Sequence, residues 1–222
     1  MNGFDFSYIL GLIQGIIPSL LCITLHELSH GYCAYLLGDD TAKKAGRLTL
    51  NPVKHIDIMG LMMMLVFHVG WAKPVPVSMY KFKNPKKGMA LTALAGPVSN
   101  FLIAVVFMLL YGLLFFPLRV NAVGRFFLEM IELTAYISIG LGIFNLLPVP
   151  PLDGSKVLFA ALSDEGYYRL MRYERYGGIA LLLLMMSGIL GRPLSNAIYF
   201  VYSNLFVIAQ LASKLVYYLF YR

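Results

Sequence analysis

The sequence predicts an all-α polytopic membrane protein, with about five transmembrane helices and a membrane-associated hairpin or re-entrant segment. Three observations support this fold class. The 222-residue chain is 59% hydrophobic and only 13% charged, with a mean hydropathy of +0.73, whereas a soluble domain carries about 25% charged residues. Long apolar segments recur along the chain, and Lys and Arg gather between them. A chain this apolar needs lipid to cover its surface.

The first apolar segment covers about residues 8–37, which is long enough to cross a bilayer with some tilt. It contains Pro18 and ends at Gly38. The segment lacks a basic start and a small-residue cleavage site, so we expect a resident span and not a removable signal peptide. Its two cysteines, Cys22 and Cys33, lie roughly 16 Å apart along one helix. They therefore cannot form a disulfide with each other.

The chain between the first and second predicted spans alternates in character. Residues 39–55 are polar and basic, and residues 56–69 are apolar again. This apolar stretch is shorter than the roughly 20 residues that a spanning helix needs. We expect it to enter the membrane and return, or to form a hairpin, because non-helical backbone is tolerated at membrane depth where it lines a cavity. Two closely spaced prolines in residues 70–77 predict an extended, edge-like segment.

The remaining chain carries four more apolar segments that we predict to be spans. They cover about residues 88–116, 124–162, 176–190 and 195–220. The second of these is interrupted by prolines at 148, 150 and 151. Length and the absence of repeats predict one domain over residues 1–222, with a motif-bearing core at about 8–162 and additional helices at about 176–220.

Basic residues predict the orientation of these spans. Residues 39–88 hold nine Lys or Arg, and further basic residues lie at 163–175, at Lys214 and at Arg222. The positive-inside rule places these segments in the cytoplasm and the N-terminus outside, in a multi-pass protein of the cell membrane. The predicted outer side holds Arg119, Arg125 and Arg192. The net charge of +7 thus reflects orientation, and we expect no nucleic-acid partner.

The strongest chemical pattern is the stretch from His26 to His30, which reads His-Glu-Leu-Ser-His. On a helix, positions i and i+4 share one face, so the two imidazoles can hold one Zn²⁺ while Glu27 serves as a general base. Ionisable groups inside a membrane span are costly, which favours a functional role. The alternatives are a chance match and a pair of packing histidines, and we favour both less.

A catalytic zinc site needs a third protein ligand. The candidates outside the motif are His55, His68, Asp57, Glu129, Glu132 and Asp153. The histidine pair and Asp153 each lie about ten residues before the predicted cytoplasmic end of a span, whereas the two glutamates lie near the outer end. Depth therefore favours Asp153, although this residue could instead cap a helix after the proline break. For His55 we expect a contact to a metal ligand or a turn position.

These residues resemble the site-2 protease family of intramembrane zinc metalloproteases. The resemblance rests on the motif from His26 to His30 and on residues 145–154, which read Asn-Leu-Leu-Pro-Val-Pro-Pro-Leu-Asp-Gly. Further matches lie at residues 51–57, 70–77 and 95–100. Together they cover residues 26–154, and the last third of the chain carries no motif that we can match.

The resemblance implies one zinc ion per chain, held by His26, His30 and Asp153, with Glu27 as the catalytic base and Asn145 near the substrate carbonyl. It further implies an intramembrane endopeptidase. Its substrates would be transmembrane or juxtamembrane segments of other proteins, as in regulated intramembrane proteolysis. The depth of these residues before the predicted cytoplasmic ends of their spans places the active site towards the cytoplasmic leaflet. We expect a compact member, without the PDZ insertion or nucleotide-sensing modules of better-known relatives.

Two other functions stay open at this point. A metal-ion transporter would also need His and carboxylate residues, but strung along a whole pathway, whereas here they gather at one depth. A non-catalytic protein that binds membrane peptides would have no need of Glu27.

Residues 70–77 could offer a strand edge to an unwound substrate or form a structural hairpin. Neither the substrate nor the oligomeric state can be read from the sequence.

Overall fold

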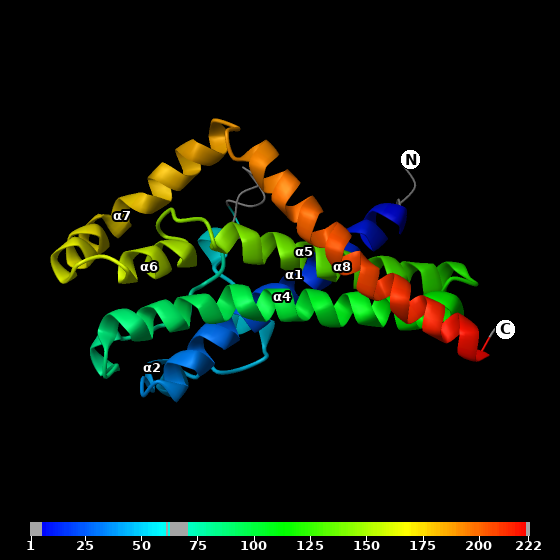
Figure 1. The fold of residues 1–222 in the computed structure, drawn as a ribbon, viewed down its shortest axis with the longest axis horizontal. Coiled ribbons are helices and arrows are strands. Elements are labelled where there is room, and N and C mark those ends of the chain that lie inside the picture. The colour runs from blue at the N-terminus through cyan, green and yellow to red at the C-terminus, as the bar shows by residue number, and fades with distance from the viewer. Residues whose placement is uncertain (1–5, 61, 63–70, 221–222) are drawn as a thin grey trace.

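The computed structural model describes residues 6–60, 62 and 71–220, and within them the chain is helical (Figure 1). The long helices are α1 (Phe6–Leu36), α4 (Pro85–Leu118), α5 (Ala122–Asn145), α7 (Asp164–Met186) and α8 (Gly191–Phe220). The short ones are α2 (Thr41–Lys44), α6 (Asp153–Ala160) and the 3₁₀ turns η1 (Pro52–His55) and η2 (Met79–Lys81). The described residues contain no strand, only an isolated antiparallel bridge between Ile56 and Ala72. The predicted all-α class is confirmed.

Helix α4 is the centre of the bundle and packs against α1, α5, α6 and α8. Figure 1 shows α2, α6 and the start of α7 at one end of the bundle, which we call the α6 end. Helices α1 and α5 begin at the opposite end, where α4 and α8 finish, and we call this the far end. At the α6 end, Lys86 Nζ lies 3.0 Å from Asp164 Oδ1 and so joins the first turns of α4 and α7.

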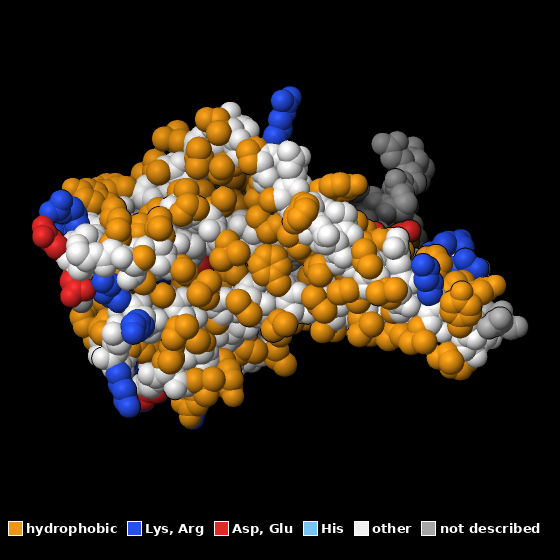
Figure 2. Space-filling model, in the orientation of Figure 1, with side chains coloured by type: hydrophobic (Ala, Val, Ile, Leu, Met, Phe, Trp, Pro, Cys, Tyr) orange, Lys and Arg blue, Asp and Glu red, His pale blue; other side chains and the backbone are white. Residues whose placement is uncertain are grey.

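Four described helices are long and apolar enough to cross a membrane, which makes the chain a multi-pass membrane protein. They are Leu10–Leu36, Pro85–Leu118, Ala122–Asn145 and Gly191–Phe220. Figure 2 shows hydrophobic side chains over most of the visible face, with charged side chains concentrated towards the two ends. Small residues let these helices approach closely: a Cβ at Gly112 would lie 2.2 Å from the carbonyl oxygen of Ala209.

The segment predicted as the span 176–190 differs from expectation. It forms the second half of α7, and its apolar part, Tyr176–Met186, is shorter than a membrane span. With that crossing missing, α8 runs alongside α4 in the same direction, so that Tyr217 contacts Phe116 near the end of α4. Lys214, predicted on the same side as residues 163–175, therefore lies towards the far end instead.

The third predicted span, 124–162, is also divided. Asn121 caps the start of α5 by accepting a hydrogen bond from the Gly124 N–H at 2.7 Å. The helix ends at Asn145, shortly before Pro148, because proline lacks an N–H and its ring forces the preceding residue out of the helical region. The chain then turns through residues 146–152 and starts α6 at Asp153. This break brings Asp153 back to the bundle.

Most of the predicted re-entrant segment, residues 56–69, lies outside the described residues, and His68 with it. Its expected entry and return therefore stay a prediction. The following stretch, residues 71–77, contains no helix, and Ala72 in it forms the single bridge to Ile56.

A candidate metal centre

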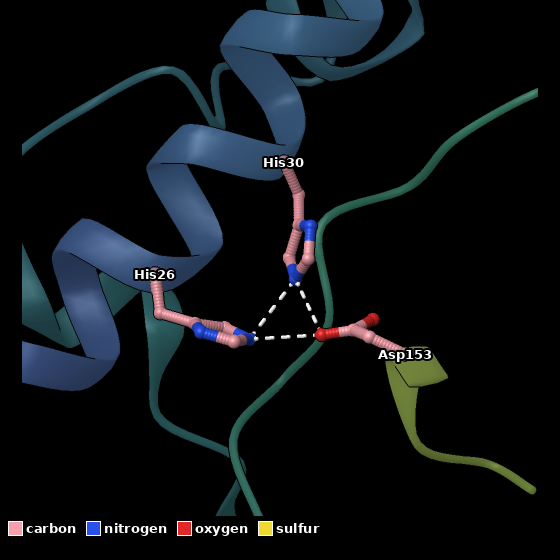
Figure 3. Close-up of side chains that lie close together, drawn as sticks. All are labelled: His26, His30 and Asp153. Carbon is pink, nitrogen blue, oxygen red and sulfur yellow. Dashed lines mark hydrogen bonds and ion pairs between the residues drawn. The ribbon is translucent and has the colours of Figure 1, made fainter. Parts of the chain in front are cut away.

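Three side chains converge at the α6 end of the bundle, where Figure 3 shows their ligating atoms facing one another. His26 Nε2 and His30 Nε2 lie 3.0 Å apart. Asp153 Oδ2 lies 3.2 Å from the first and 3.1 Å from the second. Among the described residues, this is the one group of three His, Cys, Asp or Glu side chains placed to hold a metal ion.

Local structure explains this convergence. The two histidines stand one turn apart on α1 and so project from one face. Asp153 is the first residue of α6, which begins just after the proline break. Gly154 allows the sharp return, since a Cβ there would lie 2.2 Å from the carbonyl oxygen of Leu146. The third side chain thus reaches α1 from a separate part of the chain.

The donor set fits zinc. Ligand atoms about 2.0 Å from a tetrahedral zinc ion stand about 3.3 Å apart, close to the three separations observed here. The three residues are only 4%, 8% and 8% exposed. Asp153 Oδ2 reaches ion-pair distance of both rings yet makes no hydrogen bond of acceptable geometry, so the three atoms aim at a shared point. Two nitrogens and one carboxylate oxygen leave a fourth position open.

The surroundings constrain His30 through a hydrogen bond and both rings through close packing against α4. His30 Nδ1 lies 2.7 Å from the carbonyl oxygen of Thr92 on α4, which leaves Nε2 free to bind a metal. Gly96, one turn further along α4, faces both imidazoles: a Cβ there would stand 2.4 Å from His30 Nε2 and 2.5 Å from His26 Cε1. The close approach of α4 to the two rings therefore needs a glycine at this position.

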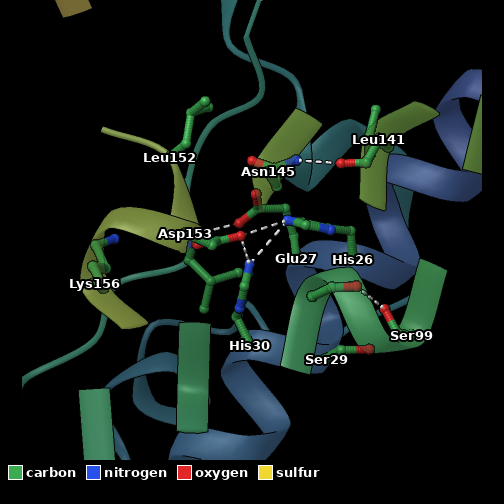
Figure 4. Close-up of polar contacts among 12 residues, drawn as sticks. His26, Glu27, Ser29, His30, Ser99, Leu141, Asn145, Leu152, Asp153 and Lys156 are labelled. Atoms are coloured by element: carbon green, nitrogen blue, oxygen red, sulfur yellow. Dashed lines mark hydrogen bonds and ion pairs between the residues drawn. The ribbon is translucent and has the colours of Figure 1, made fainter. Parts of the chain in front are cut away.

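Glu27 and Asn145 lie beside the three converging side chains (Figure 4). Glu27 is half-buried, and its Oε2 accepts a hydrogen bond from the Val75 N–H at 2.8 Å. The other oxygen, Oε1, makes no protein hydrogen bond among the described residues. Asn145 is the last residue of α5 and donates from Nδ2 to the Leu141 carbonyl at 3.0 Å. This bond lies within α5 and does not join Asn145 to another helix.

The other predicted candidates lie away from this group. His55 is buried, and its Nε2 lies 3.0 Å from the Thr49 carbonyl, so it braces the loop before residues 71–77. No hydrogen bond joins it to the three converging residues among those the structure describes. Asp57 accepts from the Gly60 N–H and so caps a turn. Glu129 and Glu132 lie near the start of α5, at the far end, as their predicted depth required.

The residues that sequence reasoning missed are those that hold the site from outside. Gly96 and Val75 both belong to motifs that carried the family resemblance, but no role followed from their sequence alone. For Val75 a signal did exist, because it stands between two prolines and thus has an isolated N–H to donate. The Thr92 carbonyl carried no signal, since any residue type offers the same backbone oxygen.

Comparisons with known proteins give relatives that are named as zinc metalloproteases. The family model for peptidase family M50 matches residues 118–188. The chain is 40% identical over 178 residues to "Putative zinc metalloprotease YwhC" of Bacillus subtilis, covering 78% of this chain and 80% of that protein. It is 29% identical over 188 residues to "Putative zinc metalloprotease Rip2" of Mycobacterium tuberculosis, covering 82% and 70%. No solved structure matches the chain.

Proposed function

The chain belongs to peptidase family M50, and we propose that this zinc metalloprotease is an intramembrane endopeptidase. It hydrolyses peptide bonds in or next to transmembrane segments of other membrane proteins, as in regulated intramembrane proteolysis. The observation that carries the proposal is the group of His26, His30 and Asp153, whose ligating atoms lie 3.0 to 3.2 Å apart. His26 and His30 lie on α1, one of the helices long and apolar enough to cross a membrane, and Glu27 lies beside the group.

We assign zinc to His26, His30 and Asp153, one ion per chain. When bound by these residues, zinc would supply Lewis-acid chemistry: it would polarise the scissile carbonyl and lower the pKa of a water molecule towards about 7. Glu27 accepts a proton from the attacking water through its free Oε1 and returns it to the leaving amine. The hydrogen bond from Val75 leaves that oxygen available, because it occupies Oε2.

Asn145 is proposed to orient the substrate. It stands at the end of α5, where the chain leaves the helix before the prolines, and it is half-buried beside the metal group. Its Nδ2 carries a second N–H beyond the one given to Leu141, and this can donate to a substrate carbonyl. We expect an unwound substrate to lie against the non-helical residues 146–152 on that side.

The charge pattern supports an orientation in the cell membrane with the N-terminus outside. Most basic residues of the described chain lie at the α6 end, including those of residues 39–54 and 81–87, whereas the far end has few. The positive-inside rule then places the α6 end in the cytoplasm and the metal group in the cytoplasmic leaflet. The C-terminal end of α8 falls outside, since four spans return the chain to the side where it began.

Replacing Glu27 by Gln tests this function. Glu27→Gln keeps the shape of the side chain but cannot accept the proton, so cleavage of a membrane-protein substrate in proteoliposomes should be abolished while about one zinc ion per chain stays bound. Glu165→Gln is the matched control, because Glu165 is exposed on α7 and, among the described residues, forms an ion pair with Arg169 alone. Cleavage by Glu27→Gln at the native rate would contradict the proposal. Transport of metal ions across the membrane without cleavage would favour the metal-ion transporter.

A further inference from the structure

Residues 73–78 form a non-helical segment that contacts α1 at Glu27 and Gly31. Pro74 and Pro76 have no N–H and fix their own φ angles, and each keeps the residue before it extended. The backbone of this segment is therefore stiff and has few donors. Its three hydrogen-bonded N–H groups go to three different parts of the protein, and we call residues 73–78 the strap.

One end of the strap is held by a buried carboxylate. Asp39, just after α1, is fully buried, and its Oδ2 accepts the Ser78 N–H at 2.6 Å. Its Oδ1 accepts from the backbone N–H and the hydroxyl of Thr41. Burial by itself raises the pKa of Asp39, but these hydrogen bonds and the nearby charge of Lys81 outweigh it and hold the pKa below its usual value. The anchor is therefore charged at neutral pH.

The other end is held by a buried cation and by the loop before it. Arg47 is 8% exposed, and its guanidinium donates to the Lys73 carbonyl at 2.7 Å. The Lys73 N–H donates to the His55 carbonyl at 2.9 Å. His55 is itself buried and bound to the Thr49 carbonyl. A buried charge is costly unless it is paired or hydrogen-bonded, so Arg47 and Asp39 are unusual for residues outside the helices.

The middle of the strap meets the proposed base. The Val75 N–H, the one donor between the two prolines, reaches Glu27 Oε2 at 2.8 Å. The Val75 side chain packs on α1 one turn further along, where a Cβ at Gly31 would stand 2.9 Å from Val75 Cγ1. Glu27 and Gly31 share one helix face, so side chain and backbone of Val75 are fixed together.

We propose that the strap orients the Glu27 carboxylate, and that Asp39 and Arg47 are positioning residues that act on the base through it. The inference rests on the proposed role of Glu27. By holding both ends of a stiff segment, the two buried charges fix where the Val75 N–H points. That donor in turn fixes which oxygen of Glu27 faces the metal group.

Hydrogen exchange of the strap amides tests the contacts without relying on activity. In the zinc-loaded protein the Val75 and Ser78 amides should be protected. Asp39→Asn turns one acceptor oxygen into an amide donor, and exchange at both amides should rise by about tenfold. Glu27→Ala should accelerate exchange at Val75 alone. Asp40→Asn is the control, because Asp40 also pairs with Lys81 but, among the described residues, makes no hydrogen bond or ion pair with the strap; it should change neither amide.

Cleavage kinetics test the consequence. Asp39→Asn and Arg47→Gln should lower kcat by about tenfold to a hundredfold, the effect of a small misplacement of a catalytic group, with KM and bound zinc nearly unchanged. Arg47→Lys should recover part of the loss, because an ammonium group can still donate to the Lys73 carbonyl. Asp40→Asn should cleave at the native rate. A rise in KM at unchanged kcat would overturn the inference, since the strap would then bind substrate and not orient the base.

The two proposals fail in different ways. If the native protein cleaves, and Asp39→Asn and Arg47→Gln change neither exchange nor kcat, the strap inference is wrong and the protease function stands. If no membrane substrate is cleaved by the native protein, the proposed function fails. Exchange at Val75 that is unchanged in Glu27→Ala would disprove the contact even where the Asp39 and Arg47 variants do not fold.

Discussion

Both ends of the helix bundle carry acidic side chains among apolar helices, but the carboxylates at the two ends have different partners. At the α6 end, Asp153 Oδ2 faces two imidazoles and makes no regular hydrogen bond. At the far end, Glu129 accepts from Gln14 Nε2 at 2.9 Å, and Glu132 accepts from the Tyr202 hydroxyl. The far-end carboxylates border an open cavity of ≈ 460 Å³, whereas the metal group is buried.

This contrast shows what separates a metal centre from acidic residues that merely tolerate a membrane. A carboxylate in an apolar setting needs a partner. The far-end glutamates already have protein donors and, at the cavity, room for water. Asp153 instead faces two ring nitrogens at metal-ligand spacing. A bound cation would therefore stabilise its carboxylate, whereas the two glutamates are already stabilised by protein donors.

The largest expected effect comes from removing one carboxylate at each end. Asp153→Ala should lose nearly all of its zinc, because two histidines alone are too few ligands for a stable site. Glu129→Ala should keep about one zinc ion per chain. Metal content of the two purified variants, compared with the native protein, measures this directly. Equal zinc loss in both variants would remove the distinction between the two ends.

A smaller effect is expected when the packing of α4 against the two histidine rings is disturbed. Gly96→Ala places a methyl group 2.4 Å from the His30 ring, so at least one imidazole must move, and zinc affinity should fall by about 10- to 100-fold. Gly140→Ala is the matched control, since its nearest neighbour, Ile198 Cδ1, would lie 3.6 Å away. Competition with a zinc chelator ranks the affinities, and a Gly96→Ala variant that binds like the control would argue against this packing.

At the far end, removing a donor should affect stability alone. Tyr202→Phe deletes the hydroxyl that serves Glu132 and should cost about 1 kcal/mol in the free energy of unfolding, because water in the cavity can replace part of the bond. Zinc content should not change. Unfolding in mixed detergent micelles, followed alongside metal content, separates the two quantities, and a loss of zinc would connect two regions that we treat as independent.

The smallest effect concerns pH and the loop at the α6 end. The pKa of Asp39 is lowered in the folded protein from an unfolded value of about 3.9, so its stabilising effect is complete above that value and is lost as the pH falls through the folded pKa. The difference in melting temperature between native protein and Asp39→Asn should stay constant from pH 7 to about 5 and shrink below about 4. A difference in melting temperature that grows as the pH falls would contradict a lowered pKa of Asp39 in the folded protein.

Much of the site could be predicted because it depends on local geometry. The spacing of His26 and His30 puts them on one helix face whatever surrounds the helix. Asp153 could be chosen over Glu129 and Glu132 because residues per span translate into depth. The span at 176–190 was predicted from apolar composition, but the apolar part of its helix, Tyr176–Met186, is shorter than a membrane span.

By itself the sequence determined the membrane class, the histidine face and the depth of Asp153, because composition and helical period act over a few residues. The tertiary structure decided that Val75 contacts Glu27, 48 residues away, that Gly96 lies against both rings, and that α8 ends beside the end of α4. These contacts depend on how distant segments pack, and backbone groups such as the Val75 N–H or the Thr92 carbonyl look alike in any sequence.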